Sequence, residues 1–143
     1  MSALRRRRLV QDLSAPDDAT RWAAAVELAQ TRDERMLRRV ERVLENGRSD
    51  EGRAAAAYVL GFSGESAFAD TLARRLVDPD ESVVVRSYSA EGLGHMLAHQ
   101  PVFAGIRTAI VTSLGDPEPE VRFWSAFAAG ALELQESRPR LER

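Results

Sequence analysis

The stretch Arg86-Ser87-Tyr88-Ser89-Ala90-Glu91-Gly92-Leu93-Gly94 decides the fold, because variants of it occur at three other places in the chain. The variants begin at Arg21, Arg53 and Arg122, so the four arginines are 32, 33 and 36 residues apart. Every copy has alanine four places after its arginine, and alanine or serine three places after it. Residues at offsets of three, four and seven lie on one face of an α-helix. The pattern therefore predicts a helical repeat whose face of small residues lets neighbouring helices pack closely.

Each of these helices follows residues that favour a helix start, namely Pro16-Asp17, Asp50-Glu51, Asp78-Pro79 and Asp116-Pro117. Proline ends the preceding helix, and a carboxylate complements the positive end of the next helix dipole. The recurring arginine opposes that dipole, so we expect it to pair with a turn carboxylate of its own or an adjacent repeat. This pairing predicts a structural ladder along the stack. Its expected members are Arg21, Arg53, Arg86, Arg122, Asp17, Asp50, Asp80 and Asp116.

A second helix is predicted between successive arginine helices. Residues 34–44, 68–77 and 102–114 each carry apolar side chains at helical spacing, and residues 3–13 form a leading helix. A single helix pair cannot bury its apolar face alone, so residues 1–143 are predicted to be one domain of about nine helices in antiparallel pairs. The repeats are placed at about 14–46, 47–78, 79–114 and 115–143, and the last one is incomplete.

The end of the last repeat is predicted to be poorly covered. Residues 135–140 look like the start of a second helix that then stops, which leaves Phe123 or Phe127 without a neighbour. We expect this end either to fold its tail back or to form a homodimer through the C-terminal repeat.

Composition narrows the classes of function. The 143 residues include no cysteine, which excludes disulfides, zinc ribbons and thiol catalysis and fits a cytoplasmic location. The chain has no apolar run long enough for a signal peptide or a membrane span. All 20 basic residues are arginine, and codon bias in a high-GC genome accounts for this without nucleic-acid binding.

A family resemblance rests on the third repeat, which reads Asp78-Pro79-Asp80, then Val83, then Val85-Arg86, and the same motif returns at Asp116-Pro117 and Val121-Arg122. The pattern resembles HEAT repeats of the short bacterial type related to the phycocyanobilin-lyase (PBS-lyase) repeat, over about residues 14–132. The resemblance implies an all-α, right-handed α-solenoid of about four HEAT-like repeats. It also implies that the first helix of each pair is convex and that the second helices line a concave face. It specifies the fold and not the function.

No catalytic or metal-binding constellation is evident. His95 and His99 are one helical turn apart, but no third ligand is near in sequence. Neither histidine is followed by glutamate, unlike the His-Glu pairs with which the HEAT-repeat deoxyhypusine hydroxylases hold metal. Histidines near a helix C-terminus commonly interact with the helix dipole. We therefore expect no metal, no cofactor, no catalytic residue and no enzyme, and we expect Trp22 and Trp124 to serve in packing.

The concave face implied by the resemblance carries six arginines. They are Arg35, Arg38, Arg42, Arg74, Arg75 and Arg107. One interpretation is a solvated face that Glu34, Glu41 and Glu45 partly neutralise. The other is an electropositive groove for a partner. A protein with an acidic surface is favoured over nucleic acid, because the isoelectric point of about 5.8 is far from that of typical nucleic-acid binders.

These observations predict a non-catalytic scaffold or adaptor that binds a protein on the concave face. Family analogy extends this prediction to an immunity or inhibitor protein. A nucleic-acid-binding protein that uses the same arginines is the alternative. A chromophore lyase is a third class, against which the missing cysteine and the missing catalytic cluster argue.

Overall fold

The computed structural model describes residues 2–99, 101 and 104–141, and in this part of the chain it contains helices and no strand. The elements are α1 (Ala3–Asp12), α2 (Asp18–Ala29), α3 (Glu34–Asn46), α4 (Asp50–Ser63), the 3-10 helix η1 (Ser66–Phe68), α5 (Ala69–Val77), α6 (Val83–Leu97), α7 (Ala104–Ser113) and α8 (Pro119–Leu141). None of the described helices combines the length and apolar character needed to cross a membrane.

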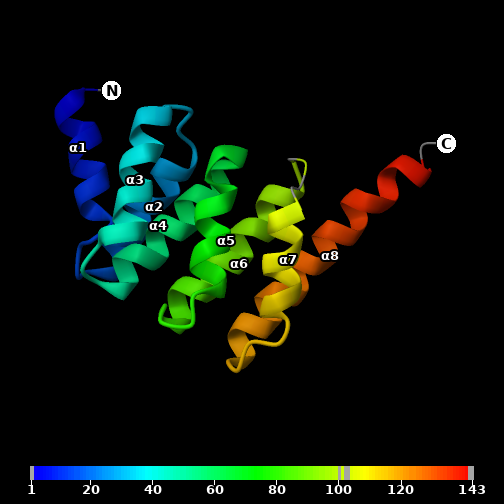
Figure 1. The fold of residues 1–143 in the computed structure, drawn as a ribbon. Coiled ribbons are helices and arrows are strands. Elements are labelled where there is room, and N and C mark those ends of the chain that lie inside the picture. Colours follow the sequence, from blue (N-terminus) through cyan, green and yellow to red (C-terminus); the bar gives the residue numbers. More distant parts are fainter. Residues whose placement is uncertain (1, 100, 102–103, 142–143) are drawn as a thin grey trace.

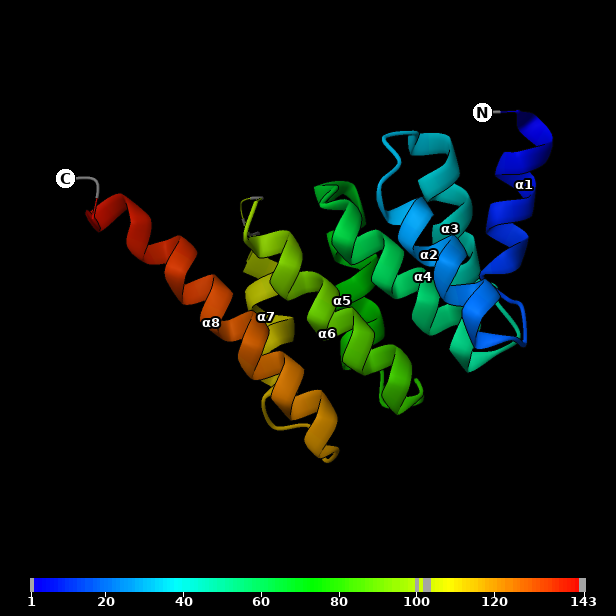
Figure 2. The ribbon, with the colours of Figure 1, turned by 180° about the vertical axis from the view of Figure 1, so that it is seen from behind.

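The helices form a solenoid of two layers. In Figure 1 the helices α3, α5 and α7 face the viewer, and in Figure 2, seen from behind, α2, α4, α6 and α8 do. We call these the second layer and the first layer. Within the first layer each helix packs on the next one in chain order, and α1 packs on α2 and α3 at one end. The all-α solenoid expected from the sequence is confirmed, whereas its right-handed sense stays a prediction.

Short polar side chains cap the starts of five helices, α1, α2, α3, α4 and α6. The Asp17 carboxylate accepts a hydrogen bond from the Thr20 backbone N–H at 2.8 Å, and Ser49 and Ser82 cap α4 and α6 in the same way. Each cap satisfies a backbone donor that has no partner inside the helix. At its other end, α4 stops at Gly64, whose φ of 72° lies in the left-handed region. Glycine adopts this conformation without steric cost.

Small residues form the contact between first-layer helices. Ala25, Ala57 and Ala90, four places after successive repeat arginines, are fully buried. The α4 and α6 backbones lie in close contact at Gly61 and Gly92. The fourth copy of this alanine, Ala126, is exposed on α8, because no further described helix packs there. The repeat face is therefore buried wherever the described stack provides a neighbour.

The last repeat differs from the sequence prediction. The second helix expected from residue 135 is absent, because α8 continues without a break to Leu141. Residues 131–136 are mostly strong helix formers with no glycine or proline, so this segment does not end the helix where a second one was expected to begin. The described chain thus has eight α-helices and one 3-10 helix, against about nine helices expected. Residues 102 and 103, expected at the start of α7, lie outside the described residues.

The continuous α8 leaves apolar side chains on the surface. Phe123 is 65% exposed, Leu134 is 67% exposed and Phe127 is partly exposed. The tail does not fold back as a separate element within the described residues. The homodimer stays a prediction, and these three side chains are its candidate contact surface.

Two glycines at the same repeat position test the close contact. A Cβ atom at Gly61 would lie 2.8 Å from the Gly92 carbonyl carbon and closer still to its Cα, whereas a Cβ at Gly130 meets no atom within 4 Å. We expect Gly61→Ala to destabilise the protein by about 2–3 kcal/mol through overpacking. We expect Gly130→Ala to stabilise it by about 0.5–1 kcal/mol through helix propensity. Urea unfolding measures both, and equal effects of the two substitutions would contradict the close contact.

Candidate functional site

The repeat arginines link neighbouring repeats. Arg53 pairs with Glu81, which precedes α6, and Arg86 pairs with Asp116 at 3.1 Å, ahead of α8. Each pair joins the start of one first-layer helix to the loop before the next. Arg86 also donates to the Glu81 carbonyl oxygen. Buried Arg86 binds one acceptor ahead of its own helix and one ahead of the next first-layer helix, so its contacts fix the spacing of these two repeats.

The first and last repeat arginines make contacts within their own repeats. Arg21 pairs with Asp18 and donates to the Ala15 carbonyl oxygen at 2.9 Å. Arg122, on the surface of α8, donates to the carbonyl oxygens of Asp116 and Pro117 at 2.9 and 3.0 Å. The carbonyl contact recurs because the arginine side chain reaches back to the loop that precedes its own helix.

The predicted carboxylates divide into two groups. Asp50 and Asp116 contact repeat arginines, with Asp50 at 3.3 Å from Arg53. Asp17 instead caps α2, and Asp80 contacts no repeat arginine within the described residues. Glu81, which the sequence analysis did not select, occupies the position expected of Asp80. Its side chain is 2% exposed and binds both Arg53 and Arg75.

Arg86 and Arg122 provide a matched test of the ladder. Arg86→Met leaves the Asp116 carboxylate, which is largely buried, without its cation. We expect a loss of about 3 kcal/mol in the free energy of unfolding. Arg122 lies on the surface, so Arg122→Met should cost less than about 1 kcal/mol. Chemical denaturation measures both variants. Similar losses in the two variants would contradict the conclusion that the Arg86–Asp116 pair stabilises the contact between repeats.

The six predicted binding arginines do not converge on one place. Arg38 pairs with Glu34 at 3.3 Å and Glu41 at 3.2 Å, and its guanidinium lies 4.9 Å from the Phe68 ring centre. Arg74 donates to the Thr71 hydroxyl at 3.3 Å, and that hydroxyl donates to Glu41 at 2.6 Å. These contacts form a polar bridge between α3 and α5.

The remaining four arginines lie in different environments. Arg75 pairs with Asp78 and Glu81 at the repeat junction, at 3.7 and 3.3 Å. Arg107 pairs with Glu136 of α8 at 2.5 Å. Arg35 and Arg42 are exposed on α3 and make no ion pair within the described residues. Of the six predicted arginines, the two without an ion pair in the described residues therefore both lie on α3.

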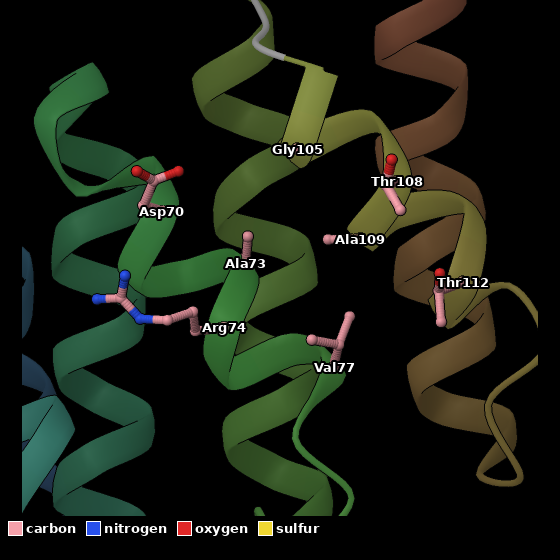
Figure 3. A pocket seen from close by; sticks show the side chains of 8 residues that line it. All are labelled: Asp70, Ala73, Arg74, Val77, Gly105, Thr108, Ala109 and Thr112. Carbon is pink, nitrogen blue, oxygen red and sulfur yellow. The ribbon is translucent and has the colours of Figure 1, made fainter.

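A groove opens between α5 and α7 in the second layer (Figure 3). Its volume is about 350 Å³, and we call it the second-layer groove. It is lined by Asp70, Ala73, Arg74, Val77, Gly105, Thr108, Ala109 and Thr112. Figure 3 shows the Arg74 guanidinium directed away from α7, so the space between the helices is bounded mainly by small and aliphatic side chains. Of the six predicted arginines, Arg74 is the one that lines this groove.

The two histidines occupy different environments. The His95 ring lies 3.9 Å from the Phe62 ring and 5.3 Å from the Phe127 ring, measured between centres, whereas His99 is exposed. Burial, and then the charge of His99, lower the pKa of His95. No three His, Cys, Asp or Glu residues in the described ranges lie close enough to hold a metal ion. His95 and His99 therefore belong to no metal-binding cluster among these described residues.

A smaller pocket between α6 and α8 was missed by the sequence analysis. It is lined by Val84, Ser87, Tyr88, Glu91, Glu120 and Trp124. Its α6 residues, from Val84 to Glu91, are spaced so that they share one helix face, and this shared face is the only sign of the pocket in the sequence. The α8 residues join them through the register of the stack. Trp22 and Trp124 are half-buried among other aromatic rings.

Glu91 gives a pH-dependent prediction. Burial raises the pKa of the Glu91 carboxyl, so its ionised form destabilises the folded state. The penalty is absent below the ordinary carboxyl pKa and grows as the pH rises through the raised value. We therefore expect Glu91→Gln to have a higher Tm than the parent at neutral pH, with the difference shrinking toward about pH 4. Thermal unfolding followed by circular dichroism measures this, with exposed Glu51→Gln as the control. A difference independent of pH would contradict it.

The chain is similar to one protein family and to a solved structure of an enzyme. The family model for HEAT repeats matches residues 7–94, which is more than half of the chain. A comparison with curated proteins gave no match. A similar solved structure is human deoxyhypusine hydroxylase in complex with glycerol, with 26% identity and a TM-score of 0.69. The similarity covers 90% of this chain and 43% of the hydroxylase chain.

This similarity corrects one expectation from the sequence. We expected no enzyme because catalytic motifs are missing, yet the fold is shared, at 26% identity, with a protein whose name is that of an enzyme. The expectation is therefore wrong as an inference from missing motifs, because a HEAT-repeat stack of this kind also occurs in a catalytic protein. The PBS-lyase type within the repeat family stays a prediction.

Proposed function

Because the chain belongs to the HEAT-repeat family, we propose that it is a scaffold or adaptor that binds a partner protein in the second-layer groove. HEAT repeats generally mediate protein interactions, and stacked repeats present extended surfaces for binding. The observation that carries the proposal is the open groove of about 350 Å³ between α5 and α7.

The groove has the form of a site for an apolar side chain of a partner. Ala73 and Ala109 are small and largely buried, while Val77 is exposed at the edge. A Cβ atom at Gly105 would meet no atom within 4 Å, so the α7 side also leaves free space. An amphipathic helix commonly binds by placing apolar anchors in such a groove between helices.

Charge favours a partner with an acidic surface. Arg74 lies at the groove, and Arg35 and Arg42 are exposed without an ion pair in the described part of the chain. Complementary charges around an apolar contact mainly increase the association rate and the specificity. The acidic residues of the partner would face α3 and α5, next to the groove.

Two glycine substitutions test the proposal. A photo-reactive side chain at exposed Thr108 captures the partner in the native cell, and the purified partner is then titrated calorimetrically. We expect Gly105→Leu to fill the groove and weaken binding at least about tenfold, which is about 1.4 kcal/mol. Gly130→Leu is the matched control, because Gly130 also has free space around it but lies on α8. Its affinity should equal that of the parent.

Charge reversal separates the protein partner from nucleic acid. Arg74→Glu should weaken the protein complex, with a larger effect at low salt. Equal affinity of the Gly105→Leu variant and the parent would contradict the groove as the site. Capture of nucleic acid alone, with salt-dependent binding lost in Arg35→Glu and Arg42→Glu, would replace the proposal by the nucleic-acid alternative.

A further inference from the structure

The pocket between α6 and α8 lies in the first layer, away from the second-layer groove. We call it the inter-repeat pocket. Its volume is about 120 Å³. This is well below the roughly 300–1,000 Å³ of a site for a whole small molecule, so the pocket accommodates a single chemical group. Its position between consecutive repeats means that two helices contribute to one site.

Two aromatic side chains line the pocket from opposite helices. Tyr88 belongs to α6 and Trp124 to α8. The Trp22 ring lies 5.3 Å from the Tyr88 ring, and the Phe127 ring lies 5.6 Å from the Trp124 ring, between centres. These neighbours restrict both rings before any ligand arrives. Restricted aromatic faces attract cations through the negative charge density above the ring.

Two carboxylates line the same pocket, and no basic residue does. The Glu91 side chain is only 16% exposed, and its one ion-pair neighbour in the described chain is His95, at 4.0 Å. Because burial lowers the pKa of His95, that ring is mainly neutral at pH 7 and gives Glu91 little compensation. Burial raises the pKa of Tyr88 and the positive charge of Arg21 acts to lower it, so this charge reaches the edge of the pocket, but Arg21 already forms an ion pair with Asp18. The negative charge of Glu91 thus has no strong cationic partner in the described chain, and exposed Glu120, in the first turn of α8, brings a second carboxylate to the pocket.

A buried hydroxyl gives a second, independent indication of a ligand. Ser87 lines the pocket, is 4% exposed, and its hydroxyl oxygen has no hydrogen-bond partner within the described residues. A buried polar atom without a partner costs about 1–3 kcal/mol, so such atoms are usually satisfied. A ligand with several N–H donors would satisfy this oxygen together with the carboxylates.

We propose that the inter-repeat pocket binds the head group of an organic cation, a guanidinium or an alkylammonium. Glu91 and Glu120 balance the positive charge, the Ser87 hydroxyl accepts a hydrogen bond, and Tyr88 and Trp124 contact the apolar part of the head group. The cation is either a side chain of a basic peptide or a free small molecule, and both present the same chemistry.

The Trp124 indole N–H signal in a ¹H–¹⁵N NMR spectrum reports binding directly, with Trp22→Phe used to assign it. The probes are N-acetyl-arginine methylamide, tetramethylammonium, and the neutral N-acetyl-citrulline methylamide, which has nearly the shape of the arginine probe. We expect a saturable shift with at least one cation and none with citrulline. Tighter binding of the arginine probe points to a peptide side chain, and tighter binding of tetramethylammonium points to a small alkylammonium.

Glu91→Gln keeps the shape of the side chain and removes its charge. We expect it to weaken cation binding at least about tenfold, the loss typical of one charge-assisted contact. Glu51→Gln, at an exposed carboxylate on α4, should bind like the parent. Circular dichroism establishes that both variants are folded. Absence of a saturable shift with either cation, equal binding of citrulline, or equal affinity of the two glutamine variants would each overturn the proposal.

Discussion

Close packing between neighbouring first-layer helices sets the geometry of the whole molecule. The alanines, serines and glycines on this face let the α4 and α6 backbones meet at Gly61 and Gly92. The first-layer helices therefore determine how far apart the repeats lie, and the second-layer helices fill the remaining space. Where that filling is incomplete, between α5 and α7, a groove remains. The arginine contacts with Glu81 and Asp116 then fix each loop against the helix before it.

The repeat fold was accessible from the sequence because its signals are local. The arginine and the alanine four places later recur in register, and start signals such as Pro16-Asp17 and Asp78-Pro79 lie just ahead of the helices that follow them. The failures concern choices that only the packed structure makes. Asp80 and Glu81 are adjacent carboxylates, and spacing alone does not show which one faces Arg53. The helix-forming residues after Leu132 continue α8, where a new helix was expected from repeat logic.

The candidate sites were harder to predict from the sequence, because they too depend on how the helices pack. The six arginines share helical faces in the sequence, but their ion pairs depend on acidic residues such as Glu136, which lies far from Arg107 along the chain. The inter-repeat pocket joins Glu91 to Trp124 across two helices. The molecule consequently has two layers of unlike character. Its arginine-rich second layer suits acidic groups, and its aromatic first layer carries the two carboxylates of the inter-repeat pocket.

The contact between Gly61 and Gly92 is not symmetric. A methyl group at Gly92 would stand 3.0 Å from the Gly61 Cα, which a small shift of the helices relieves, whereas a methyl group at Gly61 would overlap the Gly92 backbone. The two positions thus differ in how freely they change during evolution. Sequence drift is expected to admit alanine or serine in α6 long before it admits either in α4. A larger residue at Gly61 requires α4 and α6 to move apart, which would shift the position of every later repeat relative to the first ones.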